Sequence, residues 1–213
     1  FHRCKFSFFC RYGLRAKKIQ PADFDVLQRG TLVHYVLERI ISVHKKGIAY
    51  LTEDERNCEV DKYINEYLDG IKGYRSVESA RSAFLVSRIS RSLKEVVGRI
   101  AAEFSQSDFE PARCELKIGR DGEIPPLAMP YSDGKIMLEG SIDRVDTYNG
   151  YVRIIDYKTG SRTFKLPDIL FGLNLQMLIY LYAVIRSKKE DDKCAAGIFY
   201  MPSKRDLSGE GLA

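Results

Sequence analysis

The sequence of 213 residues lacks tryptophan, internal repeats and low-complexity tracts. Hydrophobic residues account for 45% of the chain and charged residues for 30%, which is an ordinary globular composition. This composition excludes a disordered tail, a collagen-like fibre and a disulfide-stapled miniprotein. The length suffices for one sizeable domain, so we expect residues 1–213 to form a single domain.

Cysteine is scarce, and its spacing matches no common framework. The chain has no C-x-x-C pair and no local cluster of histidine and cysteine; its five cysteines are Cys4, Cys10, Cys58, Cys114 and Cys194. This pattern argues against a closed zinc site within the chain and against a secreted disulfide framework. We therefore expect a reducing, cytoplasmic compartment.

Long hydrophobic runs are also missing. The most apolar segment, residues 169–185, is interrupted by Asn174 and Gln176. It is shorter than the roughly 20 residues that span a bilayer, so it predicts a buried helix and no membrane association. No signal peptide is visible. The chain starts at Phe1 without an initiator methionine, and we interpret it as a fragment of a longer chain.

Positive charge is in mild excess. Lysine and arginine number 34 against 29 for aspartate and glutamate, which gives a net charge of +5 and permits a polyanionic partner. Arg81, Arg88 and Arg99 fall on one side of a predicted helix. Both a solvated surface and a DNA track remain open for this stripe.

The hydrophobic periodicity predicts a mixed α/β order. Helical spacing covers residues 25–44, 54–70, 76–104 and 167–186, and strand patterns cover residues 113–118, 135–148, 151–159 and 195–200. The Gly- and Pro-containing stretch 119–134 predicts an irregular connection. This order favours a small mixed sheet flanked by helices, with residues 50–107 as a helical insertion over the core.

Asn149-Gly150 is the strongest hairpin signal in the chain, because both residues accept the positive φ of a type I′ turn. With these two residues in the turn, Tyr148 faces Tyr151. Pairing outward from the turn then places Asp143 directly opposite Asp156. Like charges that face each other destabilise a sheet. The arrangement is explained if one acid has a raised pKa, or if a cation lies between the two.

Carboxylate oxygens at that separation suit Mg²⁺ or Mn²⁺. Lys158 shares a strand face with Asp156, where it could contact a metal-bound water or a phosphate oxygen. Glu115 lies in a third predicted strand and could add a carboxylate to the same face. The alternative is a solvated hairpin face with incidental charges, which the apolar neighbours of Asp156 disfavour.

The segments GSIDRVD at 140–146 and IDYKTG at 155–160 resemble the core of the PD-(D/E)XK nuclease superfamily. The match is nearest to RecB-like nuclease domains, which carry G-x-x-x-H-x-x-x-E before this core and Q-x-x-x-Y after it. This chain has GTLVHYVLE at 30–38 and QMLIY at 176–180. All four pieces occur in the family's order. The resemblance implies a restriction-endonuclease-like core.

Residues 1–20 extend the resemblance. The stretch CKFSFFCRYGL at 4–14 is similar to the entry segment of AddB-type helicase–exonuclease subunits, in which the first cysteine joins three later ones in a [4Fe–4S] cluster. Cys4 would be that first ligand. The three later cysteines are absent here, so the cluster is expected only in the full-length protein.

The resemblance also assigns roles. The metal would be held by His34, Asp143, Asp156 and the main-chain carbonyl of Tyr157, with Glu115 as a direct or water-mediated ligand. Lys158 would orient and deprotonate the attacking water or stabilise the phosphorane charge. Gln176 and Tyr180 would help to position the DNA strand or the lysine. The structural alternative for His34 is a core or solvated histidine without a ligand. The structural alternative for Gln176 and Tyr180 is a satisfied hydrogen bond within an apolar helix.

These roles imply a Mg²⁺- or Mn²⁺-dependent deoxyribonuclease, an exonuclease that processes double-strand breaks in the bacterial cytoplasm. Its partners would be single-stranded DNA or unwound duplex ends and a helicase–nuclease partner subunit. One alternative is a DNA-binding scaffold with an inert nuclease core. A second alternative is a CRISPR-associated RecB-like nuclease.

Overall fold

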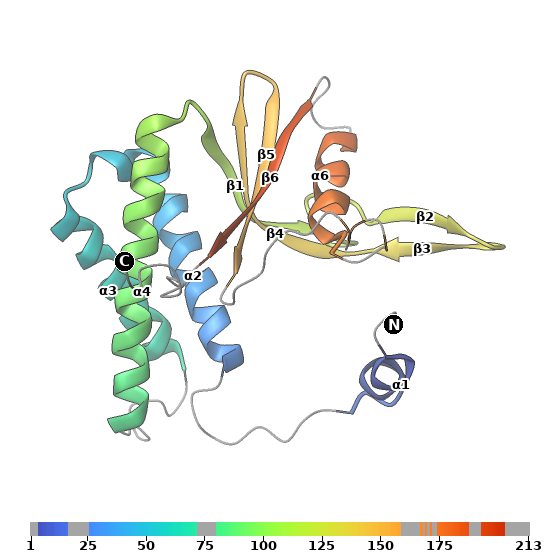
Figure 1. Ribbon diagram of the computed structural model, residues 1–213, viewed down its shortest axis with the longest axis horizontal. Coiled ribbons are helices and arrows are strands. Elements are labelled where there is room, and N and C mark those ends of the chain that lie inside the picture. The colour runs from blue at the N-terminus through green and yellow to red at the C-terminus, as the bar shows by residue number, and fades with distance from the viewer. Residues whose placement is uncertain are drawn as a thin grey trace, which may run out of the picture.

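The computed structural model describes residues 4–16, 26–71, 80–158, 167, 169, 171, 174–187 and 193–202. Its centre is a four-stranded sheet with helices on both sides (Figure 1). The strands are β1 (Glu110–Ile118), β4 (Gly140–Tyr148), β5 (Tyr151–Lys158) and β6 (Cys194–Pro202), in the spatial order β1-β4-β5-β6. Strand β4 runs antiparallel to its two neighbours β1 and β5, and β6 runs parallel to β5. The predicted small mixed sheet is confirmed.

The helices form two layers. The helices are α1 (Lys5–Phe8), α2 (Val26–His44), α3 (Glu53–Gly70), α4 (Ala80–Gln106) and α6 (Gln176–Arg186), with a π-helical turn at Phe9–Gly13 and a 3₁₀ turn at Lys45–Tyr50. Apolar residues of α2, α3 and α4 pack with Ile155 and Tyr157 on one face of the sheet. Apolar residues of α6 pack with Val152 and Ile154 on the other face. We call these clusters the α2–α4 core and the α6 core.

Local sequence signals explain where the helices begin. Thr52 caps α3, since its hydroxyl accepts the backbone N–H of Glu55 while the Glu55 carboxylate accepts the backbone N–H of Thr52. Helix α4 follows an apolar stripe that includes Leu93, Ile100 and Phe104, all buried. None of the described helices is long and apolar enough to cross a membrane.

The turn that joins β4 to β5 is as predicted. Asn149 has φ 46° and Gly150 has φ 81°, the left-handed values that a type I′ turn requires. Tyr148 pairs with Tyr151, and the register continues without a slip to Arg144 opposite Ile155. The paired ladder ends there, so Asp143 and Asp156 are the next residues of the two strands beyond it.

One predicted strand is wrong in extent. The sequence pattern predicts a single strand over residues 135–148 after an irregular connection. Instead β2 (Leu127–Tyr131) and β3 (Gly134–Leu138) form a separate two-stranded ribbon, and β4 starts only at Gly140. Ser132, with φ 45°, lets the chain reverse between β2 and β3. This ribbon extends away from the main sheet (Figure 1).

The predicted helix 167–186 is interrupted where the structure describes it: residues 167 and 169 are helical, but the helix does not run unbroken to residue 186. Helix α6 starts at Gln176, because Asn174 has φ 57° and cannot continue a right-handed helix. Part of the stretch before Asn174 lies outside the described residues. The buried apolar face of α6 is nevertheless confirmed by Met177, Leu181 and Val184.

Candidate functional site

Three side chains from separate elements meet at one edge of the sheet. His34 comes from α2, Glu115 from β1 and Asp143 from β4. The Nδ1 atom of His34 lies 3.3 Å from Asp143 Oδ1 and 3.5 Å from Glu115 Oε1. One potential ligand atom from each residue lies within 4.8 Å of the others. The structure therefore brings together three of the residues that the sequence nominates, in a group that could hold a metal ion.

A backbone irregularity turns Glu115 toward this group. Glu115 has φ 48°, a conformation that is rare for a non-glycine residue inside a strand. Its neighbours Cys114 and Leu116 pack in the α2–α4 core and the α6 core respectively. Residues two apart on a regular strand share a face, so the strand changes faces at Glu115.

The same interruption occurs opposite, in β4. Ile142 and Val145, which are three residues apart, both belong to the α6 core. Arg144 lies on the other side, with its guanidinium 4.8 Å from the centre of the Phe104 ring on α4. Asp143 therefore sits where the alternation of faces fails, and both carboxylates are directed to the sheet edge that His34 covers.

Asp156 and Lys158 lie beside this group on β5. The Lys158 ammonium is 2.5 Å from Asp156 Oδ2, and the Asp156 residue is only 6% exposed. Burial raises the pKa of Asp156, the ion pair with Lys158 opposes that rise, and the nearby negative charge of Asp143 adds to it. The two acids are thus close enough to repel each other, and Lys158 points toward Asp156.

Tyr157 links the two strands below the acids. Its backbone N–H donates a 2.6 Å hydrogen bond to Asp143 Oδ2. Its side chain is buried in the α2–α4 core, and its ring meets the His34 ring edge-on with centroids 6.2 Å apart. The backbone hydrogen bond fixes the Asp143 carboxylate, while the ring supports His34.

The charges of the acids act strongly on His34. Hydrogen bonds to Asp143 and Glu115 raise the pKa of His34 from 6.5 to about 10, against the opposing effect of burial. The reciprocal hydrogen bond from His34 lowers the pKa of Glu115. Without a metal ion, a proton on His34 therefore offsets the repulsion between the carboxylates at neutral pH.

This raised pKa predicts a pH-dependent contribution of His34 to stability. The stabilising charge is fully present below about pH 6.5 and disappears as the pH rises through about 10, because the folded pKa exceeds the unfolded one. In EDTA, His34→Gln is expected to lower the free energy of unfolding by about 1–2 kcal/mol near pH 6, a value reduced for solvent screening at a third-exposed side chain. The difference should vanish above about pH 10.5 in urea titrations. A difference that grew with pH would contradict the assignment.

Gln176 and Tyr180 lie on α6, at the spacing of one helical turn. The Gln176 side-chain amide donates to the Tyr180 hydroxyl at 3.1 Å. A Cβ atom at Gly140 would clash with that hydroxyl oxygen, so the glycine makes room for the Tyr180 ring beside the start of β4. The structural alternative for this pair, a hydrogen bond within an apolar helix, is thus present.

Sequence reasoning missed two partners of the site residues. Ser141 donates a 3.0 Å hydrogen bond to Glu115 Oε2 and so holds the second oxygen of that carboxylate. Lys117 lies close enough for its charge to lower the pKa of Glu115. Strand alternation would have grouped Ser141 with Asp143 but could not have connected it to β1.

A buried charge network, also missed, lies behind the site. Arg144 is fully buried and pairs with Asp146 at 2.9 Å and with Glu103 at 3.0 Å. Arg153 contacts both of these acids. The Arg144 Nη1 atom lies 3.3 Å from the Tyr157 hydroxyl. Although Arg144 directly follows Asp143, it therefore takes a structural role and pairs with nearby acids.

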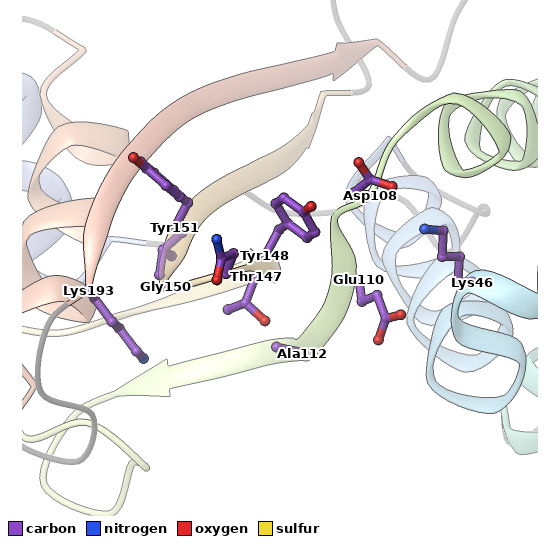
Figure 2. A pocket seen from close by; sticks show the side chains of 11 residues that line it. Lys46, Asp108, Glu110, Ala112, Thr147, Tyr148, Gly150, Tyr151 and Lys193 are labelled. Carbon is purple, nitrogen blue, oxygen red and sulfur yellow. The ribbon is translucent and has the colours of Figure 1, made fainter.

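Two of the cavities formed by the described residues lie beside the sheet. One, of about 700 Å³, is lined by residues 117–122 and 139–141 and reaches the site through Ser141. The other, of about 590 Å³, surrounds the Asn149-Gly150 turn at the opposite end of the hairpin, between Tyr148, Tyr151 and Lys193 (Figure 2). None of the predicted site residues lines this second cavity.

The remaining predicted residue, Cys4, is exposed directly before α1. Among the described residues, Phe6, Phe9 and Tyr12 of the same segment are also largely exposed. No disulfide joins the cysteines of the described part. The role of Cys4 in a cluster therefore stays a prediction.

Comparison with known proteins agrees with this geometry. The family model of the PD-(D/E)XK nuclease superfamily matches residues 1–211. An ATP-dependent helicase/deoxyribonuclease subunit of Caldanaerobacter subterraneus subsp. tengcongensis is 36% identical over 98% of this chain and 20% of its own length. The proteins of the same name from Clostridioides difficile and Clostridium tetani are each 35% identical, over 89% and 94% of this chain and 17% and 18% of their own lengths.

The chain thus spans about a fifth of the length of these relatives. The family model covers nearly all of the chain, and it confirms the resemblance seen in four sequence pieces. The chain belongs to the PD-(D/E)XK nuclease superfamily.

Proposed function

We propose that this domain hydrolyses phosphodiester bonds of DNA, as an exonuclease that depends on Mg²⁺ or Mn²⁺. The observation that carries the proposal is the convergence of His34, Glu115 and Asp143 within 4.8 Å, with the Asp156–Lys158 pair alongside. Opposed acids that destabilise an isolated sheet become favourable when they share a cation. One imidazole nitrogen and several carboxylate oxygens suit these hard divalent ions.

In this proposal His34, Asp143, Asp156 and the main-chain carbonyl of Tyr157 hold the ion, with Glu115 as a direct or water-mediated ligand. When bound, the ion lowers the pKa of a water molecule and polarises the phosphoryl oxygen. Ser141 keeps Glu115 in place through its 3.0 Å hydrogen bond, and the backbone of Tyr157 does the same for Asp143. These fixed orientations favour a preorganised site.

Lys158 supplies the remaining chemistry. After releasing its own proton to solvent, the neutral Lys158 amine orients the attacking water and takes up its proton; alternatively, the ammonium donates to the phosphorane oxygen that gains negative charge. Its position beside Asp156 places it where either role is within reach. Gln176 and Tyr180 would hold the strand or the lysine in line, with Gly140 making room for the Tyr180 ring.

The cavity beside Ser141 is the proposed path for the DNA backbone. Lys117 and Arg120 line it and are exposed, so they can contact phosphates. Three glycines, at positions 119, 122 and 140, leave parts of its walls without side chains. Because such contacts are electrostatic, DNA affinity should fall as salt is added. Arg99 of the predicted arginine stripe takes part in a contact within the domain, since it donates to the carbonyl of Pro202.

The relatives are named as helicase/deoxyribonuclease subunits. The first of them is about five times as long as this chain. We extend the proposal accordingly: the domain works within a longer bacterial polypeptide, together with a helicase partner subunit, in the processing of double-strand breaks. In that polypeptide Cys4 would be the first ligand of a [4Fe–4S] cluster. Residues 50–107, which contain α3 and α4, would be a helical insertion over the core.

The test is a cleavage and stability assay on the same preparation. With Mn²⁺ at about 100 times its Kd, the free energy of unfolding is expected to rise by about 2.7 kcal/mol, or about 5–10 °C in Tm. Linear duplex and single-stranded DNA should be shortened with Mg²⁺ or Mn²⁺ and remain intact in EDTA. Stabilisation without cleavage would indicate a metal-binding but inert domain. The absence of both stabilisation and cleavage would refute the proposal.

A further inference from the structure

Strand β6 brings an aromatic side chain to the candidate catalytic lysine. It pairs in parallel with β5, with Tyr200 beside Asp156 and Pro202 beside Lys158. Direct partners on neighbouring strands point to the same face of a sheet. Tyr200 packs against the α6 core, on the face that Asp156 and Lys158 share with Val152 and Ile154. Neither the family motif nor the spacing of the sequence singles out this residue.

Groups of different kinds approach the Lys158 ammonium, and two of them bear on its position. One is Asp156 Oδ2 at 2.5 Å, and the other is the face of the Tyr200 ring, whose centre is 5.6 Å from Nζ. The second distance falls within the range of a cation–π contact, about 6 Å. The lysine thus contacts a carboxylate that the proposed function makes a metal ligand and a ring to which the proposed function gives no role in metal binding.

The end of β6 is held in place, so the ring has a fixed position. Arg99 of α4 donates a 2.8 Å hydrogen bond to the carbonyl of Pro202, two residues beyond Tyr200. Met201, between them, packs against the α2–α4 core. Tyr200 itself is only partly exposed and packs against the α6 core. A ring anchored on both sides can orient a flexible side chain that lies over it.

We propose that Tyr200 is a positioning residue for Lys158: its ring face holds the ammonium when a divalent ion occupies the Asp156 carboxylate. The inference rests on the proposed function. A divalent ion on Asp156 repels the ammonium and weakens its hold on that carboxylate. The ring attracts a cation without competing for the ion, and its π face takes up none of the acceptor positions that water or phosphate would offer to the ammonium.

The ring, and not the hydroxyl, carries this role. Tyr200→Phe keeps the ring and is expected to retain at least about half of the wild-type kcat, whereas Tyr200→Leu should lower kcat about tenfold with KM and Mn²⁺ affinity unchanged. Tyr200→Met is a second variant, with a flexible apolar side chain, in case Leu disturbs the strand. Tyr182→Leu is the matched control, since Arg186 lies 5.4 Å from that ring on α6, outside the site.

A second readout needs no activity. In the metal-free wild type, the ring current of Tyr200 should shift the Lys158 Cε proton resonances upfield in NMR spectra. The shift should persist in Tyr200→Phe and be absent in Tyr200→Leu and Tyr200→Met. Its persistence in the Leu and Met variants, or normal kcat in both, would overturn the inference. Equal losses in Phe and Leu would also overturn it, because they would assign the role to the hydroxyl.

These outcomes separate the inference from the proposed function. A wild type that neither binds Mn²⁺ nor cleaves DNA refutes the function and with it the positioning role of Tyr200 in cleavage. A wild type that cleaves, together with a Leu variant that cleaves equally well, refutes the inference alone.

Discussion

Lys158→Met is expected to lower DNA cleavage by about 1,000-fold while the affinity for Mn²⁺ stays within a factor of about two. The ammonium contacts the Asp156 carboxylate and the Tyr200 ring but is not itself a metal ligand. In the proposed mechanism, its loss removes proton transfer and charge stabilisation in the transition state and leaves the proposed metal ligands in place. Methionine keeps most of the length of the side chain, so packing against Tyr200 is preserved. Single-turnover cleavage and calorimetric Mn²⁺ titration measure the two quantities.

Asp156→Asn provides the contrasting variant. It should also lose cleavage, but it should bind Mn²⁺ at least about tenfold more weakly, because a charged ligand becomes neutral. The two variants therefore separate a ligand from a group that acts on the reacting atoms. Normal cleavage by both variants would show that this hairpin face is not the active site. If Lys158→Met lost as much Mn²⁺ affinity as Asp156→Asn, Lys158 would act by keeping the metal ligands in position.

The part of the site that was predictable depends on local chemistry. Asn149-Gly150 fixes a two-residue turn, and the turn fixes the register as far as Arg144 and Ile155. The position of Asp143 near Asp156 follows from that register alone. Periodicity places His34 on a helix, but only the resemblance to a family brings it to the acids, because nothing local tells a helix which strand end it will cover.

The part that was missed depends on contacts between distant segments. The φ of 48° at Glu115 breaks the strand period that every sequence pattern assumes. Tyr200 reaches Lys158 only because β6 joins β5 in parallel, with the register set by packing on both faces. The β2–β3 ribbon escapes prediction because Pro130 and Gly134 are unfavourable in strands, yet both are tolerated in an exposed ribbon without further strands.

The buried charge network beside the site is expected to dominate the stability of this domain. Arg144 is 0% exposed and faces Asp146, also 0% exposed, together with Glu103. A buried pair contributes little compared with apolar residues of the same volume, but removing one partner leaves the other charge without compensation. The network therefore acts as a constraint: it holds β4, β5 and α4 in the one arrangement in which every charge is paired.

Arg144→Met is consequently expected to lower the free energy of unfolding by about 3–5 kcal/mol, measured by urea denaturation in EDTA with an unchanged m value. Arg113→Met, which removes an exposed arginine paired with Glu123 at 3.4 Å, should cost less than about 0.5 kcal/mol. The double variant Arg144→Met/Asp146→Leu should recover part of the loss, because it removes the excess negative charge that remains when Arg153 alone faces Asp146 and Glu103. A single variant as mild as the control would mean that water reaches the network. A double variant less stable than Arg144→Met would mean that Arg153 alone satisfies Asp146. The Arg144–Asp146 and Arg153–Asp146 pairs would then contribute independently to the free energy of unfolding.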